Sequence, residues 1–160
     1  MDIDGTTVIR PAVEGDAAAI ARLHLASRAA TMPYLPPQRR TEDEVTHWIR
    51  EIVLPECRTW IAVRDGEPVG YAAVEDALLE QLYLRPDVLR QGIGTLLLDE
   101  AKRYRPTGLS LHVFEQNTGA RAFYARHGFT VVDRSDGSRN MERLPDMTLR
   151  WTPQRAADGD

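Results

Sequence analysis

Two glycines one residue apart, Gly92 and Gly94, mark the part of this sequence that is best suited to binding a charged ligand. They lie in the segment RQGIGT, between a strand expected over 78–84 and a helix that begins at the glycines. A phosphate can approach the backbone closely at glycine, and the amides at a helix start carry partial positive charge. The segment therefore indicates an anion-binding loop, although a lone G-x-G can also form a simple tight turn.

The residues after the second glycine argue against the two commonest nucleotide-binding loops. A Walker loop needs Lys and then Ser or Thr there, whereas Leu96 and Leu97 follow Thr95. A dinucleotide-binding fingerprint needs a third Gly or Ala at position 97, where this chain has leucine. ATP and NAD are therefore disfavoured, and another phosphate-bearing ligand is expected.

This loop and a second motif resemble those of the GNAT superfamily of N-acetyltransferases. The family's acetyl-coenzyme A loop reads Q/R-x-x-G-x-G/A after a strand, and here Leu89 replaces the first Gln or Arg. That side-chain contact is lost, while the backbone contacts are expected to remain. The second motif combines a strand over 109–114, Asn117, and the run Ala122-Phe123-Tyr124-x-x-x-Gly128-Phe129. Both motifs stand in the family's order, and the resemblance spans most of the chain.

The resemblance implies a fold and a donor site. The fold is an α/β, GNAT-like mixed and mostly antiparallel sheet of about seven strands, with helices on both faces and a splay between strands 4 and 5. The pantetheine arm of acetyl-coenzyme A would pair with Leu82, Tyr83 and Leu84, and the Leu82 amide would polarise the acetyl carbonyl. Asn117 would contact the pantetheine chain, act as a plain helix N-cap, or do both. The pyrophosphate would bind Arg90, Gln91, Gly92, Ile93, Gly94 and Thr95.

Two side chains are candidates for the proton transfers of direct acetyl transfer to an amine. Tyr124 is the candidate donor to the departing thiolate, since a phenol has a pKa near 10, and its alternative role is packing beside Phe123. Glu80 is the candidate base for the ammonium, because strand alternation would put it on the face of Leu82 and Leu84. A solvated carboxylate fits Glu80 equally well, and His112 is the second candidate for the base.

Acceptor selectivity is expected to come from two other regions. One is the first loop and helix pair, with Tyr34, Leu35 and Trp48, although core packing is favoured for the tryptophan. The other is the late loop over 139–146, where Glu142 and Asp146 could attract a cationic amine or simply be solvated.

The elements that must position these residues follow from hydrophobic spacing and turn signals. A strand over 7–10 ends at Pro11, and Asp16 can cap a helix with a stripe of Ile20, Leu23 and Ser27. After a proline-rich loop over 32–37, Thr41 and Glu44 form a capping box. The helix that follows has an apolar face of Val45, Trp48, Ile49 and Ile52.

The second half of the pattern begins with a hairpin around Asp65-Gly66-Glu67-Pro68. Strands are expected over 59–64, 69–75, 78–84, 109–114, 129–134 and 147–151. A helix opening at 92–94 is closed by Pro106 and Gly108, and a short helix spans 119–126 with Gly128 at its C′ position. The strand over 109–114 is nearly all apolar and is expected to be buried, parallel and central. The element order is β-α-α-β-β-β-α-β-α-β-β.

Composition limits the class of protein. The chain has 160 residues, of which 42% are hydrophobic and 28% charged, so one domain over 1–160 is expected, with flexible tails at 1–6 and 156–160. No apolar run is long enough for a membrane span, and the first residues lack a secretory signal. The net charge of −4 argues against a nucleic-acid partner. With Cys57 as the single cysteine and no ligand-like histidine spacing, a cytoplasmic location and no metal are expected.

The sequence therefore predicts an N-acetyltransferase that uses acetyl-CoA as co-substrate and acts on a primary amine. The acidic composition favours a small-molecule amine, and a peptide or protein amine is also possible. The alternative from another class is a non-catalytic acyl-CoA-binding sensor or interaction module. Because dimers are common in the family, a homodimer is possible.

Overall fold

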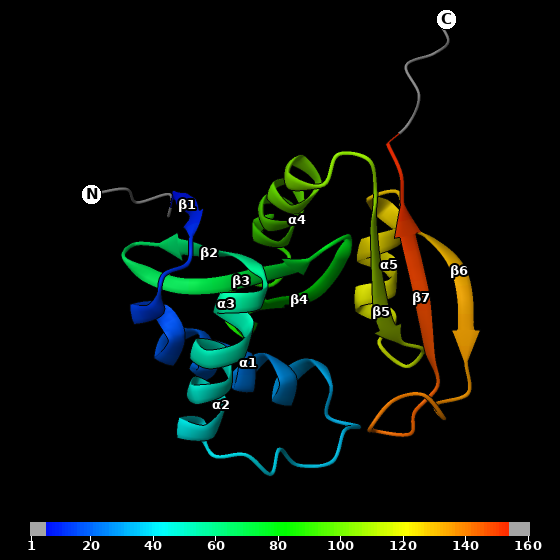
Figure 1. The fold of residues 1–160 in the computed structure, drawn as a ribbon, viewed down its shortest axis with the longest axis horizontal. Coiled ribbons are helices and arrows are strands. Elements are labelled where there is room, and N and C mark those ends of the chain that lie inside the picture. Colours follow the sequence, from blue (N-terminus) through cyan, green and yellow to red (C-terminus); the bar gives the residue numbers. More distant parts are fainter. Residues whose placement is uncertain (1–5, 154–160) are drawn as a thin grey trace, which may run out of the picture. The chain divides into compact units, whose positions relative to one another are not determined.

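The computed structural model describes residues 6–153, and these contain the expected order of strands and helices (Figure 1). Two segments were expected to be flexible tails, 1–6 and 156–160. Of these, only Thr6 lies within the described residues. By its internal contacts the chain divides into two compact units, residues 1–101 and 102–160. The expectation of a single domain over 1–160 stays a prediction.

The first unit contains four antiparallel strands in sequence order. They are β1 (Thr7–Pro11), β2 (Arg58–Arg64), β3 (Glu67–Glu75) and β4 (Leu78–Leu84). The turn between β2 and β3 consists of Asp65 and Gly66 alone, with φ angles of 53° and 77°. Positive φ at both central residues is the geometry of the type I′ turn, a common two-residue hairpin connection. The turn is shorter than the predicted four-residue loop because β3 already begins at Glu67.

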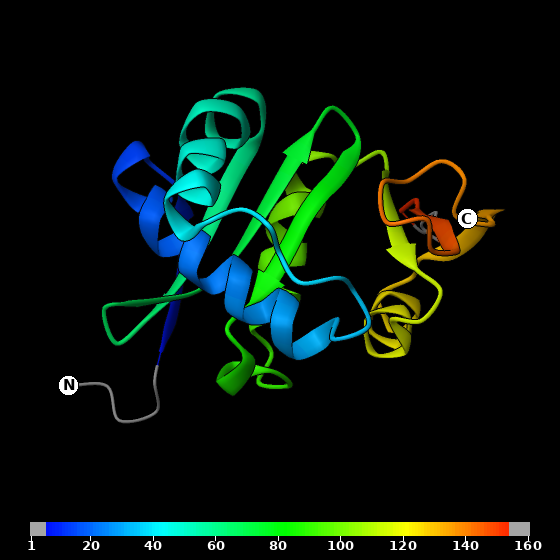
Figure 2. The same cartoon turned by 90° about the horizontal axis from the view of Figure 1, so that it is seen from below.

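Helices cover both faces of this four-stranded sheet. Helix α1 (Ala17–Thr31) packs against the face that carries Tyr71, together with Ile61 and Ala73 (Figure 2). Helix α4 (Ile93–Tyr104) packs on the other face, where a Cβ atom on Gly70 would lie 3.1 Å from Leu97 Cδ1. Neighbouring residues of β3 thus point to opposite helical layers, as strand alternation requires.

Asp16 occupies the N-cap position of α1, as predicted, but its side chain makes no capping hydrogen bond to that helix. Asp16 ends a 3₁₀ turn, η1 (Glu14–Asp16), and its carboxylate accepts the Val13 amide at 2.7 Å. The same carboxylate accepts a hydrogen bond from each of the two terminal nitrogens of Arg10, both at 2.9 Å. The predicted stripe of Ile20, Leu23 and Ser27 is buried.

The second helical segment begins as predicted and then departs from a regular α-helix. Thr41 and Glu44 form the expected capping box at the start of α2 (Glu42–Trp48). A π-helical turn, η2 (Ile49–Val53), and a short α3 (Leu54–Glu56) follow. The extra residue in the π turn changes the helical periodicity, so Val53 is buried and Ile52 is 44% exposed. The prediction that Ile52 lies on the apolar face of this helix is therefore wrong.

The second unit contains β5 (Leu109–Phe114), α5 (Thr118–Arg126), β6 (Thr130–Ser135) and β7 (Asp146–Trp151). Strand β7 pairs antiparallel with both β5 and β6. Strand β5 is buried on one face only, because Leu111 and Val113 are buried whereas His112 is exposed. The expectation that this strand is buried therefore holds for one face only, and its apolar run reflects that covered face.

Candidate active site

The strand expected to present the acetyl group, β4, contains an irregularity at Glu80. Leu82 pairs with Ala72 and Gln81 with Ala73, but the next pair joins Leu79 to Val74, so Glu80 is skipped. One extra residue in a strand is a β-bulge, which interrupts regular alternation. The alternation on which the placement of Glu80 beside Leu82 and Leu84 rested therefore does not run through this residue.

Glu80 is exposed, and its charge acts on a neighbouring thiol. Burial raises the pKa of Cys57 to about 11, and the carboxylates of Glu75, Glu80 and Glu56 add to the rise. The end of the β3–β4 hairpin thus carries a negative potential around a half-buried cysteine. This potential is compatible with a cationic amine, and the role of Glu80 as a base stays a prediction.

The segment after β4 forms an exposed loop with two left-handed residues. The Arg85 amide donates to the Val69 carbonyl at 2.8 Å, and a 3₁₀ turn, η3 (Pro86–Val88), follows. Arg90 and Gly92 then adopt φ angles of 65° and 86°. A Cβ atom on Gly92 would meet nothing within 4 Å, so glycine is needed here for its backbone conformation.

The side chain of Gln91 holds this loop from both sides. Its Oε1 accepts a hydrogen bond from Arg64 at the end of β2, and its Nε2 donates to the Asp87 carbonyl at 3.3 Å. Because both groups of this amide are used, Gln91 acts as a brace of the loop. Its predicted contact with a ligand can then involve its backbone amide or the second N–H of Nε2.

Helix α4 begins directly after the loop, with Ile93, Gly94 and Thr95 in its first turn. The Leu96 amide donates to the Gly92 carbonyl at 3.2 Å, so the amides before it point out of the helix N-terminus. Gly94 is buried within the helix and, unlike Gly92, does not adopt positive φ. Of the two glycines, only Gly92 therefore needs glycine's freedom to adopt a left-handed conformation, whereas Gly94 lies within the first helical turn.

The second motif forms α5. Asn117 is the N-cap of this helix, and its Oδ1 accepts the Ala120 amide at 3.2 Å. Tyr124 is only 8% exposed, and its ring packs edge-on against Phe123 and Phe129. The Phe129 amide donates to the Tyr124 carbonyl at 3.0 Å, and Gly128 follows the helix with a φ of 91°. Both alternative structural roles, capping for Asn117 and packing for Tyr124, are thus present.

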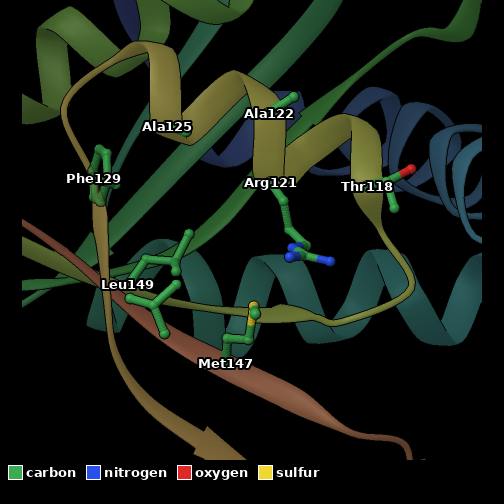
Figure 3. A pocket seen from close by; sticks show the side chains of 8 residues that line it. Thr118, Arg121, Ala122, Ala125, Phe129, Met147 and Leu149 are labelled. Atoms are coloured by element: carbon green, nitrogen blue, oxygen red, sulfur yellow. The ribbon is translucent and has the colours of Figure 1, made fainter.

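A cavity of about 400 Å³ lies beside α5 but does not contain the predicted site residues (Figure 3). Neither Asn117 nor Tyr124 lines it. Arg121, whose side chain Figure 3 shows extending from α5, donates to the Glu115 carbonyl at 2.9 Å. The cavity walls are otherwise largely apolar: Thr118, Ala122, Ala125, Phe129, Val131, Met147 and Leu149.

The remaining candidates lie in separate surroundings. His112 is exposed on β5, with Nδ1 3.1 Å from the Thr148 hydroxyl. Trp48 packs against the core of the first unit, as favoured above. In the late loop, the Asn140 side chain donates to the Leu144 carbonyl at 2.7 Å and accepts its amide at 3.2 Å. This loop is therefore internally braced.

Sequence reasoning missed a buried polar pair between α1 and β3. His24, on α1, is 7% exposed, and its Nδ1 lies 2.7 Å from the hydroxyl of the fully buried Tyr71. Burial lowers the pKa of His24 to about 4, and Arg28 and Arg40 act in the same direction. The spacing of His24 from Ile20 and Ser27 put it on the buried helical face, which was the available signal.

Within residues 6–153, no group of three or more His, Cys, Asp or Glu side chains could hold a metal ion. No helix in the same range is long and apolar enough to cross a membrane.

Comparisons with known proteins agree with these features. A profile of the Acetyltransferase (GNAT) family matches residues 22–129. The peptidyl-lysine N-acetyltransferase YjaB of Salmonella typhimurium is 44% identical over 84 residues, which are 52% of this chain and 57% of that protein. The match thus spans little more than half the length of this relative.

Two solved structures extend the likeness over most of the chain. Apo-form YjaB from Escherichia coli has a TM-score of 0.74 and 27% identity, and the match covers 93% of this chain and 99% of that one. The PaiA N-acetyltransferase from Thermoplasma acidophilum, solved with coenzyme A, has a TM-score of 0.73, 23% identity and coverage of 92% and 99%. These likenesses confirm the predicted α/β fold, and with the profile match they show that the chain belongs to the GNAT family of acetyltransferases.

Proposed function

We propose that this chain is an N-acetyltransferase that moves the acetyl group of acetyl-CoA directly to a primary amine. The observation that carries the proposal is the loop after β4, where left-handed Gly92 precedes the outward-pointing amides of α4. This arrangement suits a pyrophosphate, because amides and helix dipole act on it together. The coenzyme A in the PaiA structure supports the same donor class.

The donor contacts follow from the two motifs. The backbone of Leu82, Tyr83 and Leu84 pairs with the pantetheine arm, and the loop from Arg90 to Thr95 binds the pyrophosphate. Asn117 contacts the pantetheine chain while it caps α5, since one Oδ1 bond leaves the Nδ2 group as a donor. A hydrogen bond from the Leu82 amide to the acetyl oxygen strengthens as negative charge develops there.

The proposed reaction combines proton transfers with the formation of a carbon–nitrogen bond and the cleavage of a carbon–sulfur bond. Glu80, directly or through a water, takes a proton from the acceptor ammonium, and the amine nitrogen then attacks the thioester carbon. The nitrogen of the tetrahedral intermediate then releases its second proton to solvent, and the intermediate collapses as the carbon–sulfur bond breaks. Tyr124 gives a proton to the leaving thiolate and regains one from solvent, so the products are an N-acetylated amine and coenzyme A. No acetyl group becomes attached to the protein.

The acceptor in this proposal is a primary alkyl amine. The name of the Salmonella relative supports a lysine side chain in a peptide. The acidic composition supports a small cationic metabolite, which presents the same ammonium group. A cytoplasmic location and a homodimer belong to the proposal as well, and the molar mass of the purified chain by light scattering tests the second.

An acceptor screen tests the proposal. Thiol release from acetyl-CoA is followed with lysyl peptides, peptides with a free N-terminus, amino acids and polyamines, and mass spectrometry identifies the acetylated product. Acceptor-dependent release with an acetylated amine supports the enzyme. Tight binding of acetyl-CoA without turnover on any acceptor supports the sensor instead.

A further inference from the structure

The polar pair His24 and Tyr71 is connected to β4, although neither residue belongs to that strand. Tyr71 lies on β3 and is fully buried, and its hydroxyl is 2.7 Å from His24 Nδ1. The same hydroxyl lies 3.4 Å from Oε1 of Gln81, which is on β4. A polar chain therefore runs from α1 through β3 to the strand that carries Leu82.

The number of protons available to these two hydrogen bonds determines which atom donates in each of them. The Tyr71 hydroxyl has one proton, and Gln81 Oε1 can only accept. When Tyr71 donates to Gln81, His24 must donate to Tyr71 from Nδ1, which is the Nδ1–H tautomer of a neutral imidazole. Every atom of the chain then has a partner of the right kind, and the Gln81 side chain has one preferred orientation.

Ring contacts give β4 a second connection to His24. The centroid of the Tyr83 ring lies 4.5 Å from that of His24, and Tyr83 stacks on Tyr71 at 5.9 Å and 20°. The His24 ring also meets Trp48 edge-on at 5.6 Å. Gln81 and Tyr83 are thus both held from the α1 side, and Leu82 lies between them.

The position of these contacts along β4 is informative. The bulge at Glu80 interrupts pairing with β3 one residue before Gln81, so Gln81 and Leu82 are the first regularly paired residues after the irregularity. A leucine or phenylalanine core could fill the same space without the cost of burying a hydroxyl and an imidazole. The satisfied polar chain instead fixes one geometry.

We propose that His24 and Tyr71 are positioning residues that align the Leu82 amide with the acetyl carbonyl of bound acetyl-CoA. This inference rests on the proposed function, because it needs the acetyl group at Leu82. Coenzyme A lacks the acetyl carbonyl that the Leu82 amide would bind. A misaligned Leu82 amide therefore weakens the binding of acetyl-CoA and leaves the binding of coenzyme A nearly unchanged. A substitution that only loosens the fold is expected to weaken the binding of acetyl-CoA and of coenzyme A equally.

The test compares the affinity ratio of acetyl-CoA to coenzyme A in wild type, Tyr71→Phe and Gln81→Met. Both variants keep side-chain shape and remove one member of the chain. Loss of one hydrogen bond predicts a fall in the ratio by about 2- to 10-fold. The infrared carbonyl frequency of bound, ¹³C-labelled acetyl-CoA shifts toward its value in water in both variants, and kcat falls while KM for the acceptor stays. Ile61→Val, in the same core, controls for reduced packing.

His24 is tested by a rescue pair. His24→Asn keeps an amide nitrogen near the position of Nδ1 and is expected to retain more of the affinity ratio than His24→Leu. The positioning role alone is overturned if the wild type is active but the variants behave like it. In that case the affinity ratio of acetyl-CoA to coenzyme A and the carbonyl frequency are unchanged in Gln81→Met and in folded Tyr71→Phe. A wild type that neither binds nor turns over acetyl-CoA overturns the proposed function and the positioning role with it. Gln81→Met changes only a half-buried side chain, so this arm gives a result even if Tyr71→Phe does not fold.

Discussion

The Leu96 amide donates to the Gly92 carbonyl at 3.2 Å, and this bond begins α4 at a residue with a φ of 86°. The left-handed residue turns the chain so that the preceding loop and the first helical amides can face the same ligand. In the proposed function, that ligand is the pyrophosphate of acetyl-CoA.

Replacing Gly92 by valine is expected to weaken coenzyme A binding by at least about 10-fold. A β-branched residue is strained at positive φ, so the loop must change its backbone to relieve a strain of about 1–3 kcal/mol. Calorimetric titration measures the affinity. Gly66→Val is the matched control, because Gly66 also has positive φ and open space around its Cβ position, but lies in the β2–β3 turn. Wild-type affinity in a folded Gly92→Val protein would contradict the loop assignment.

Tyr124→Phe is expected to lower kcat by roughly 10- to 1,000-fold, at or below the roughly 100- to 10,000-fold that general acid–base catalysis typically contributes. The ring contacts with Phe123 and Phe129 are kept, so coenzyme A affinity and thermal stability change little. Steady-state rates at saturating acceptor, with chemistry shown to limit turnover, measure the effect. Tyr104→Phe, on α4, removes a hydroxyl that the mechanism does not use. An unchanged kcat in Tyr124→Phe leaves this tyrosine with its packing role only.

Glu80→Gln is expected to lose activity most at about pH 6 to 7 and to recover partly at high pH, where the amine supplies its own neutral fraction. The pH profile of kcat/KM, measured with one acceptor for both proteins, tests this role. Equal loss at every pH indicates that Glu80 positions the acceptor. A profile identical to that of wild type transfers the role to His112 or a water, and the same series on His112→Gln distinguishes these two.

The stability of the fold is expected to depend on pH through His24. Burial lowers the pKa of this imidazole to about 4, whereas in the unfolded chain it is about 6.5. The unfolded state therefore binds the proton more readily, and stability from neutral His24 is complete above about pH 6.5. It is lost as the pH falls toward 4, by about 3 kcal/mol in total.

Urea unfolding at about pH 7.5 and pH 5 measures this loss, with His24→Leu as the reference. The variant cannot titrate at this position, while carboxylates such as Asp16 titrate in both proteins. The wild type should therefore lose more free energy of unfolding over this pH range than the variant does. Parallel losses would show that His24 does not titrate as its burial implies.

Local signals were enough to predict most elements of this fold. The capping box of Thr41 and Glu44, the Asp-Gly turn and the glycine after α5 each act within a few residues, so sequence alone located them. The position of Ile52 was wrong because a π turn changes helical periodicity without a clear sequence mark. The bulge at Glu80 depends on how β4 pairs with β3, and no local pattern encodes that register.

Much of the candidate site was predictable for the same reason. The loop around Gly92 and the cap at Asn117 are local features, and the family resemblance gave them a role. The contact of His24 with Tyr71 joins residues 47 positions apart, so it became visible only in the folded chain. The spacing of His24 indicated its burial, but its bond to Tyr71, which no spacing rule reports, led to the positioning role proposed above.

The most direct test of direct acetyl transfer is the fate of a labelled acetyl group during one turnover. Enzyme, acetyl-labelled acetyl-CoA and a lysyl peptide or other acceptor from the screen are mixed and quenched over time. The account predicts one acetylated amine for each thiol released, and no labelled protein in the absence of acceptor. Label accumulating on the protein, or thiol release that yields only acetate, would contradict it.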